Sequence, residues 1–142
     1  MLPFRSLRLA VLATCIVPGL LLAQAAPGPD KSFDEFFQRF VAEQLFRLDR
    51  TSNPLKVKIG NPRAGDVRSE KWDRKQVKSD LPVPMTADQL KEKSLDQRIR
   101  RHSHTRIEVV QYSPGADTTL LLYTFQLSRG HWFLTHFENS SR

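Results

Sequence analysis

The feature that most constrains the fold is a series of three closely spaced β-strand patterns at the C-terminal end of the chain. Thr105 to Tyr112 is rich in residues that favour strands, and Thr118 to Leu127 is apolar with few interruptions. A third pattern follows at Trp132 to Phe137. The turn residues between them, Ser113 to Asp117 and Arg129-Gly130, predict an antiparallel meander. Because the middle strand is apolar on both faces, we expect one face to meet a helix and the other to meet more protein or line a cavity.

A single amphipathic helix is predicted to cover that sheet. Ser32 followed by Glu35 has the pattern of a capping box, which begins a helix. The apolar spacing continues through Leu48, so we expect one helix of about four turns that ends before Pro54. Four phenylalanines lie on its apolar face, and we interpret them as core residues because helical spacing alone explains them: Phe33, Phe36, Phe37 and Phe40.

The middle of the chain carries shorter elements. Leu55 to Ile59 alternates apolar residues with Lys56 and Lys58, which predicts a half-buried strand with both lysines outward. Two further elements are a strand within Val67 to Val77 that carries Trp72 and an extended linker at Leu81 to Pro84. Thr86 and Gln89 have the pattern of a capping box, which predicts a short helix that ends near Ser94.

The first 25 residues have the pattern of an export signal. Arg5 and Arg8 form a basic start, Leu9 to Leu22 is mostly apolar, and Ala23-Gln24-Ala25 is a small-x-small cleavage site. The apolar run is short and Pro18-Gly19 interrupts it, so we expect no membrane span. The expected organisation is therefore a signal peptide at 1–25, a flexible leader at 26–31 and one domain at 32–142.

Cys15 is the only cysteine of the chain and lies inside the predicted signal. A lipid anchor on Cys15 is disfavoured because Thr14 is larger than the residues usual before a lipidated cysteine. Removal of Arg5 and Arg8 lowers the formal net charge from +7 to +5. This modest charge is not concentrated in one stripe, so we expect no nucleic-acid partner. The predicted signal indicates an exported protein, periplasmic or secreted.

Three stretches carry a resemblance to a known family. They are Phe33-x-x-Phe36-x-x-x-Phe40 with Phe46, then Arg50 to Leu55 with Trp72, and last Arg129 to Leu134, which has the gly-x-trp-x-leu ending. The chain resembles a family of secreted bacterial domains of unknown function with a cystatin-like, nuclear-transport-factor-two-like fold. The resemblance implies an α+β fold in which the N-terminal amphipathic helix packs on a curved antiparallel sheet to form an open cone. It carries no catalytic residues with it.

The interior of such a cone gives the first candidate site. His136 is two residues from Leu134 and four from Trp132, so we expect the three side chains to share a strand face beside an apolar cavity. His136 is then a candidate general base, with Tyr123 and Asp49 as candidate partners. The candidate pocket residues are Tyr123, Trp132, Leu134 and His136.

A second candidate is the basic segment around two histidines. Arg98, Arg100 and Arg106 project together if the segment from Arg98 to Arg106 is extended, and they could engage phosphates or sulfates. The alternative is a solvated charged face. His102 and His104 could bind zinc, but no third ligand lies at a suitable spacing, so we expect no metal and no cofactor.

These observations favour a non-catalytic binding or interaction protein that holds a small apolar ligand or a protein partner. One alternative is a lyase- or isomerase-like enzyme that uses His136 in the cone cavity, so whether the chain is an enzyme stays open. Another is an envelope module that docks on anionic surfaces through Arg98, Arg100 and Arg106. An exposed sheet face could also support a homodimer.

Overall fold

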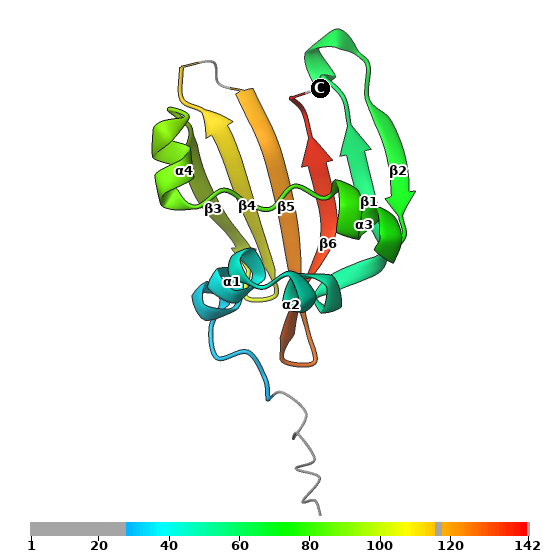
Figure 1. Ribbon diagram of the computed structural model, residues 1–142, viewed down its shortest axis with the longest axis vertical. Helices are drawn as coiled ribbons and strands as arrows, with labels where there is room; N and C mark the ends of the chain where they lie inside the picture. Colours follow the sequence, from blue (N-terminus) through cyan, green and yellow to red (C-terminus); the bar gives the residue numbers. More distant parts are fainter. Residues whose placement is uncertain (1–27, 116–117, 142) are drawn as a thin grey trace, which may run out of the picture.

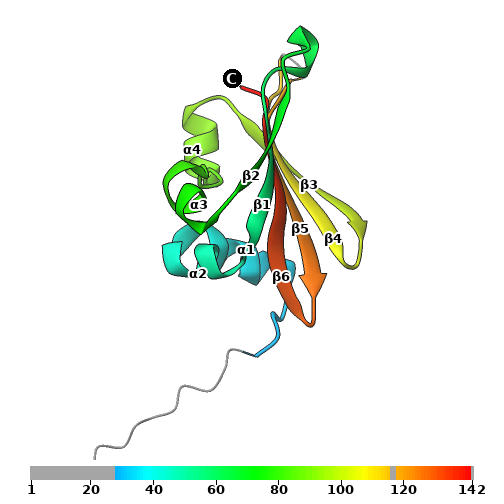
Figure 2. The ribbon, with the colours of Figure 1, turned by 90° about the vertical axis from the view of Figure 1, so that its right-hand side faces the viewer.

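The computed structural model describes residues 28–115 and 118–141 (Figure 1). Six strands form one sheet in the order β2-β1-β6-β5-β4-β3, and the α-helices lie on one side of it (Figure 2). The strands are β1 (Thr51–Ile59), β2 (Arg68–Trp72), β3 (Asp96–Ser103), β4 (Arg106–Ser113), β5 (Thr118–Ser128) and β6 (His131–Asn139). The helices are α1 (Phe33–Ala42), α2 (Gln44–Asp49), α3 (Arg74–Asp80), α4 (Ala87–Glu92) and the 3₁₀ turn η1 (Pro62–Ala64).

The sheet is antiparallel except where β1 runs parallel to β6. The register shifts in four of its five strand pairs, and such irregularities bend the strands that carry them. The predicted fold class is confirmed, because the chain is an α+β protein whose N-terminal helix packs on a curved sheet that does not close.

The predicted aromatic face of the N-terminal helix forms the core. Phe125 of β5 makes edge-to-face contacts with Phe33, Phe36 and Phe40, at ring-centroid distances of 5.4, 5.6 and 5.2 Å. Phe40 and Phe125 are completely buried, as is Leu134 of β6. The helix-covered face of the sheet is therefore filled by side chains.

The prediction of one continuous helix is wrong at Glu43. The backbone of Glu43 is extended, so α1 ends at Ala42 and α2 begins at Gln44. The guanidinium of Arg47 donates to the carbonyls of Phe40 and Val41 at 2.7 and 2.9 Å, which satisfies groups left open at the end of α1. After the break the buried face changes, and Leu45 is 78% exposed.

Two predicted strands also have different bounds. The strand expected to reach Val77 ends at Trp72, because Asp73 and Gln76 form a capping box that begins α3. The segment from Arg98 to Arg106 is not one strand but two, joined by a turn at His104 and Thr105. The linker at Leu81 to Pro84 and the helix that begins after Thr86 are confirmed.

Asp30, expected in a flexible leader, is instead firmly held. Its side chain is 9% exposed, and the carboxylate accepts hydrogen bonds from the Arg50 guanidinium at 2.9 Å and from the backbone N–H of Trp132 at 2.8 Å. Its own N–H donates to the Gly130 carbonyl at 2.9 Å. The leader is thus attached to the β5–β6 hairpin at this residue. The predicted signal peptide lies outside the described residues, within which no helix is long and apolar enough to cross a membrane.

Candidate functional site

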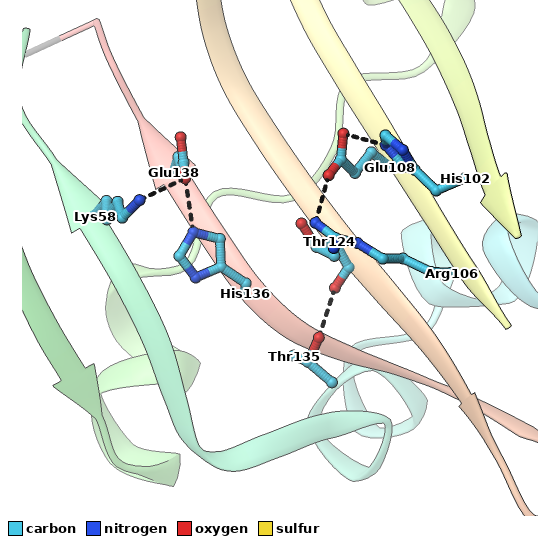
Figure 3. A network of polar contacts seen from close by, with 8 residues as sticks. All are labelled: Lys58, His102, Arg106, Glu108, Thr124, Thr135, His136 and Glu138. Atoms are coloured by element: carbon cyan, nitrogen blue, oxygen red, sulfur yellow. Dashed lines mark hydrogen bonds and ion pairs between the residues drawn. The ribbon is translucent and has the colours of Figure 1, made fainter. Parts of the chain in front are cut away.

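The face of the sheet opposite the helices carries an open hollow of about 560 Å³, which we call the sheet hollow. Side chains from β1, β6, β5 and β4 line it, and Figure 3 shows the polar contacts among several of them. The predicted contact of the middle strand with a helix on one face is confirmed, and its other face lines this hollow through Leu122 and Thr124. The charged and imidazole side chains of the lining are Lys56, Lys58, Arg106, Glu108, His136 and Glu138.

One row of directly opposite residues crosses all six strands on this face. Residues directly opposite in a sheet share a face, so the register places their side chains beside one another. We call this set the central row; from β2 to β3 it consists of Lys71, Lys56, His136, Thr124, Glu108 and Arg100. It is cationic at both ends, with a carboxylate and an imidazole nearer the middle.

The placement of His136 corrects a prediction made from strand alternation. Trp132 and Leu134 are buried in the core, but His136 lines the sheet hollow on the other face. The cause is a bulge in β6, because Thr124 pairs with His136 whereas the next residue, Phe125, pairs with Leu134. Thr135 is the extra residue, and it shifts the alternation by one. His136 therefore does not share a face with Trp132 and Leu134.

Tyr123, the remaining pocket candidate, also lies in the core. Its side chain is completely buried, and its hydroxyl donates to the Pro82 carbonyl at 3.0 Å. Burial raises the pKa of this phenol well above its ordinary value, so it stays protonated. Asp49, the other candidate partner of His136, is exposed and pairs with Arg74. The structure therefore brings neither residue to His136.

Glu138 holds the first of two polar clusters on the sheet hollow (Figure 3). Its carboxylate lies 2.8 Å from Nε2 of His136 and 3.4 Å from Nζ of Lys58. His136 and Glu138 are alternate residues of β6, whereas Lys58 comes from the neighbouring β1. The parallel pairing of β1 with β6 creates this cluster.

Glu108 holds the second cluster. Nε2 of His102 lies 2.7 Å from one carboxylate oxygen, and the Arg106 guanidinium donates to the other at 2.9 Å. Burial opposes the charged form of this 10% exposed side chain, but the hydrogen bonds from His102 and Arg106 outweigh it and hold the pKa of Glu108 below its ordinary value. Glu108 is therefore a carboxylate at neutral pH.

The cations at the ends of the central row lack such partners. Among the described residues, Lys56, Lys71 and Arg100 make no ion pair or side-chain hydrogen bond. Lys56 and Lys71 lie directly opposite one another in β1 and β2. Like charges in this position destabilise a sheet, so the pair is a local cost to the stability of the fold.

The three predicted arginines share the helix-free face, although they come from two strands. Arg98 and Arg100 lie on β3 opposite Val110 and Glu108, and Arg106 on β4 lines the sheet hollow. Arg98 also lies over the Tyr112 ring, 5.1 Å from its centroid. Whether these arginines bind an anionic surface stays a prediction.

The two histidines considered for zinc do not face each other. His102 contacts Glu108, whereas His104 lines a separate hollow with Phe33 and Trp132 on the other side of the sheet. Within residues 28–115 and 118–141, no group of three or more histidine, cysteine, aspartate and glutamate residues could hold a metal ion.

Sequence reasoning placed Lys56 outward but missed its neighbours. The alternation from Leu55 to Ile59 gave the correct face, with the apolar residues buried and both lysines exposed. Its position beside His136 depends on the parallel β1–β6 pairing, which joins segments about 80 residues apart in the chain. No local pattern in either segment indicates that pairing.

No protein-family model and no curated protein matches the chain. Solved structures do match its fold. A nuclear-transport-factor-two-like (NTF2-like) protein from Bacteroides fragilis is 17% identical with a TM-score of 0.56, and the match covers 82% of this chain but only 50% of that one. A cystatin-like protein from Bacteroides caccae is 12% identical with a TM-score of 0.55, and the match covers 81% of this chain and 79% of that one.

A protein from Bacteroides uniformis is similar to the same extent. It is 15% identical with a TM-score of 0.54, and the match covers 80% of this chain and 79% of that one. At such low identity these matches concern architecture alone, and function has to be argued from the residues of this chain. The curved sheet, the helices on one of its faces and these neighbours together show that the chain has an NTF2-like, cystatin-like fold.

Proposed function

We propose that this chain is an exported, non-catalytic binding module that recognises an anionic group on the helix-free face of its sheet. The observation that carries the proposal is the pair Lys56 and Lys71, which face each other across β1 and β2 without an acidic partner among the described residues. An anion placed between the two ammonium groups would remove their repulsion and add charge-assisted hydrogen bonds.

The surroundings of this pair favour the same ligand chemistry. A hollow of about 460 Å³ lies at the β1–β2 end of the face, and its lining residues are Lys56, Val57, Lys58, Ser69, Glu70, Lys71 and His136. The carboxylate among them, Glu70, already pairs with Arg68 and with the indole of Trp72. Ser69 offers a hydroxyl, and Lys58 is directly opposite it. A phosphate, sulfate or carboxylate group would find several donors here within one open site.

An apolar ligand is less well supported. The helix-covered face, where an apolar cavity was expected, is occupied by Phe36, Phe40 and Phe125. The enzymatic alternative required His136 beside that cavity, and the bulge at Thr135 directs it to the opposite face. No observation now favours this second function over anion binding.

Titration calorimetry with inorganic pyrophosphate tests the proposal. We expect the mature protein to bind it, and we expect Lys56→Gln with Lys71→Gln to weaken binding about tenfold, which is about 1.4 kcal/mol. The matched control is Lys91→Gln with Lys93→Gln, which makes the same charge change at exposed residues at the end of α4. This control should keep the affinity within about twofold of the original protein, since surface charges at a distance are screened.

The ligand-free stability of the same variants provides a second readout. If Lys56 and Lys71 serve binding and not folding, their removal relieves repulsion and raises the free energy of unfolding by about 0.2–1 kcal/mol. A structural role would make the double variant less stable. Absence of pyrophosphate binding by the original protein, or an equal loss in both variants, would contradict the proposal.

Export rests on the basic start at Arg5 and Arg8, the apolar run and the Ala23-Gln24-Ala25 site. It is tested separately by the mass of the protein recovered from the envelope and the medium of its own host. We expect a chain that starts near Ala26. An intact first residue, or an added lipid on Cys15, would contradict this part of the proposal.

A further inference from the structure

Strand β3 forms one edge of the sheet and has an open outer side. Within the part of the chain that the structure describes, β4 is the only strand that pairs with it. Helix α4 approaches only the beginning of the strand, around Leu95 to Gln97. From Arg98 to Ser103 the outward backbone N–H and C=O groups are therefore available to another strand. Figure 2 shows β3 at the margin of the sheet.

The side chains along this edge alternate in chemistry. Arg98 and Arg100 project from the helix-free face, as their partners Val110 and Glu108 do. Ile99 projects from the other face and is 40% exposed, whereas its partner Val109 is completely buried. The edge thus offers two cations on one side, and on the other Ile99 together with Arg101, which is paired with Asp34.

We propose that β3 binds an extended polypeptide segment in which acidic and apolar residues alternate, added to the sheet as a further strand. The backbone of that segment would pair with the open edge of β3. Its acidic side chains would lie on the helix-free face beside Arg98 and Arg100, and its apolar side chains would cover Ile99. Among the described residues Arg100 makes no ion pair or side-chain hydrogen bond, so it can bind a carboxylate without breaking an existing contact.

A second copy of the chain fits this edge poorly. Two β3 strands placed side by side would bring Arg98 and Arg100 close to the same arginines of the other copy, and like charges on neighbouring strands destabilise a sheet. The charges that prevent self-association attract an acidic strand, because complementary charge selects the partner and accelerates its encounter. This inference does not depend on the anion site proposed between Lys56 and Lys71, which lies at the β1–β2 end of the sheet.

The test uses a short fluorescent peptide of alternating glutamate and valine, with both ends blocked, and the mature protein. We expect a rise in fluorescence anisotropy on binding and slower hydrogen exchange of the backbone amides from Arg98 to Ser103. Arg98→Gln with Arg100→Gln should weaken binding at least about tenfold, through the loss of two charge-assisted contacts. The matched control, Lys75→Gln with Lys78→Gln on α3, should stay within about twofold because these residues lie near the other edge of the sheet.

Backbone methylation of the peptide separates strand addition from charge attraction alone. Only every second residue of an added strand donates its N–H to the edge, so N-methylation of one alternate set should abolish binding and methylation of the other set should be tolerated. Ile99→Thr, which keeps a β-branched residue in the strand, should weaken binding about threefold through lost apolar contact.

Several results would overturn the inference. They are absence of binding by the original protein, equal effects of the two methylated peptides, or exchange protection outside β3. Binding of a lysine–valine peptide with equal affinity would also overturn it. Circular dichroism of each variant shows whether it is folded, and the methylated peptides test the inference on the unaltered protein. The Lys56 and Lys71 variants should bind the peptide normally, and the Arg98 and Arg100 variants should bind pyrophosphate normally.

Discussion

Phe125 and Thr124 are neighbours in β5, yet they lie on faces with opposite properties. The Phe125 ring is completely buried and lies within 6 Å of four other phenylalanine rings, at 5.2 to 5.9 Å between centroids. Thr124 lies on the face without helices, between His136 and Glu108 of the adjacent strands. One strand therefore separates an aromatic core from a charged, open surface.

The comparison indicates where stability and function reside in this fold. On the helix-covered face, the aromatic contacts bury apolar area and stabilise the folded chain. On the helix-free face, Lys56 opposes Lys71, an arrangement that costs stability. Residues kept in unfavourable positions are better candidates for binding than residues that pack well, since proteins retain such costs mainly at functional sites.

The largest effect is expected from Phe125→Ala on the helix-covered face. It removes the ring that joins Phe33, Phe36 and Phe40, and such core truncations cost about 3–5 kcal/mol of the free energy of unfolding. Urea denaturation of the mature protein measures the change. Gln126→Ala, the next residue on the exposed face, is the control and should change stability by about 0.5 kcal/mol or less. Similar losses in both variants would contradict the division into two faces.

The next largest effect is expected at the buried ion pair between Arg50 and Asp30, beside the β5–β6 hairpin. Arg50→Met removes the guanidinium, which lies over the Phe46 and Phe133 rings, and leaves the Asp30 carboxylate without its cation. Breaking a buried pair costs about 3–5 kcal/mol, and we expect about 2–3 because the leader can detach and return Asp30 to water. Urea denaturation measures the loss, and faster hydrogen exchange at the Asp30 and Trp132 amides would show the detachment. Unchanged exchange there would contradict the anchoring role of Asp30.

A smaller effect is expected for Tyr123→Phe. The substitution removes the hydroxyl that donates to the Pro82 carbonyl and leaves the buried ring in place. Loss of one such hydrogen bond costs about 1 kcal/mol. Thermal unfolding at neutral pH measures it. A change of several kcal/mol would mean that the linker at Pro82 depends on this contact more than the packing suggests.

The helix-covered face was predictable from sequence because it rests on local periodicity. Phe33, Phe36 and Phe40 recur at helical spacing, and the structure buries all three. The break at Glu43 was not predictable from the same periodicity, because the apolar spacing continues through it. What stabilises the break is the contact of Arg47 with the carbonyls of Phe40 and Val41, which periodicity does not record.

The helix-free face was predictable only in part. Alternation placed Lys56 and Lys58 outward, but it also placed His136 with Leu134, because a bulge leaves no pattern in the sequence. If Thr135 were absent, His136 would follow Leu134 directly, and alternation would correctly place it on the helix-free face. Because Thr135 is present, alternation from Leu134 predicts the wrong face for His136. The pairing of β1 with β6, which brings Lys56 to His136, depends on the whole chain and not on either strand.

The smallest effect is expected for Glu108→Gln, and it depends on pH. The folded protein holds the pKa of Glu108 below its ordinary value through His102 and Arg106, so the carboxylate adds stability above the ordinary pKa and loses it as the pH falls through the lowered one. The variant should therefore be less stable than the original protein at pH 7. The expected difference is about 0.5 kcal/mol, because the His102 and Arg106 side chains are half exposed. Near pH 3 the two proteins should have similar stability. Thermal unfolding across this range measures the difference. Glu92→Gln on α4, an exposed residue, serves as the control and should leave the pH profile unchanged. An equal loss of stability at pH 3 and pH 7 would mean that Glu108 acts through packing and not through its charge.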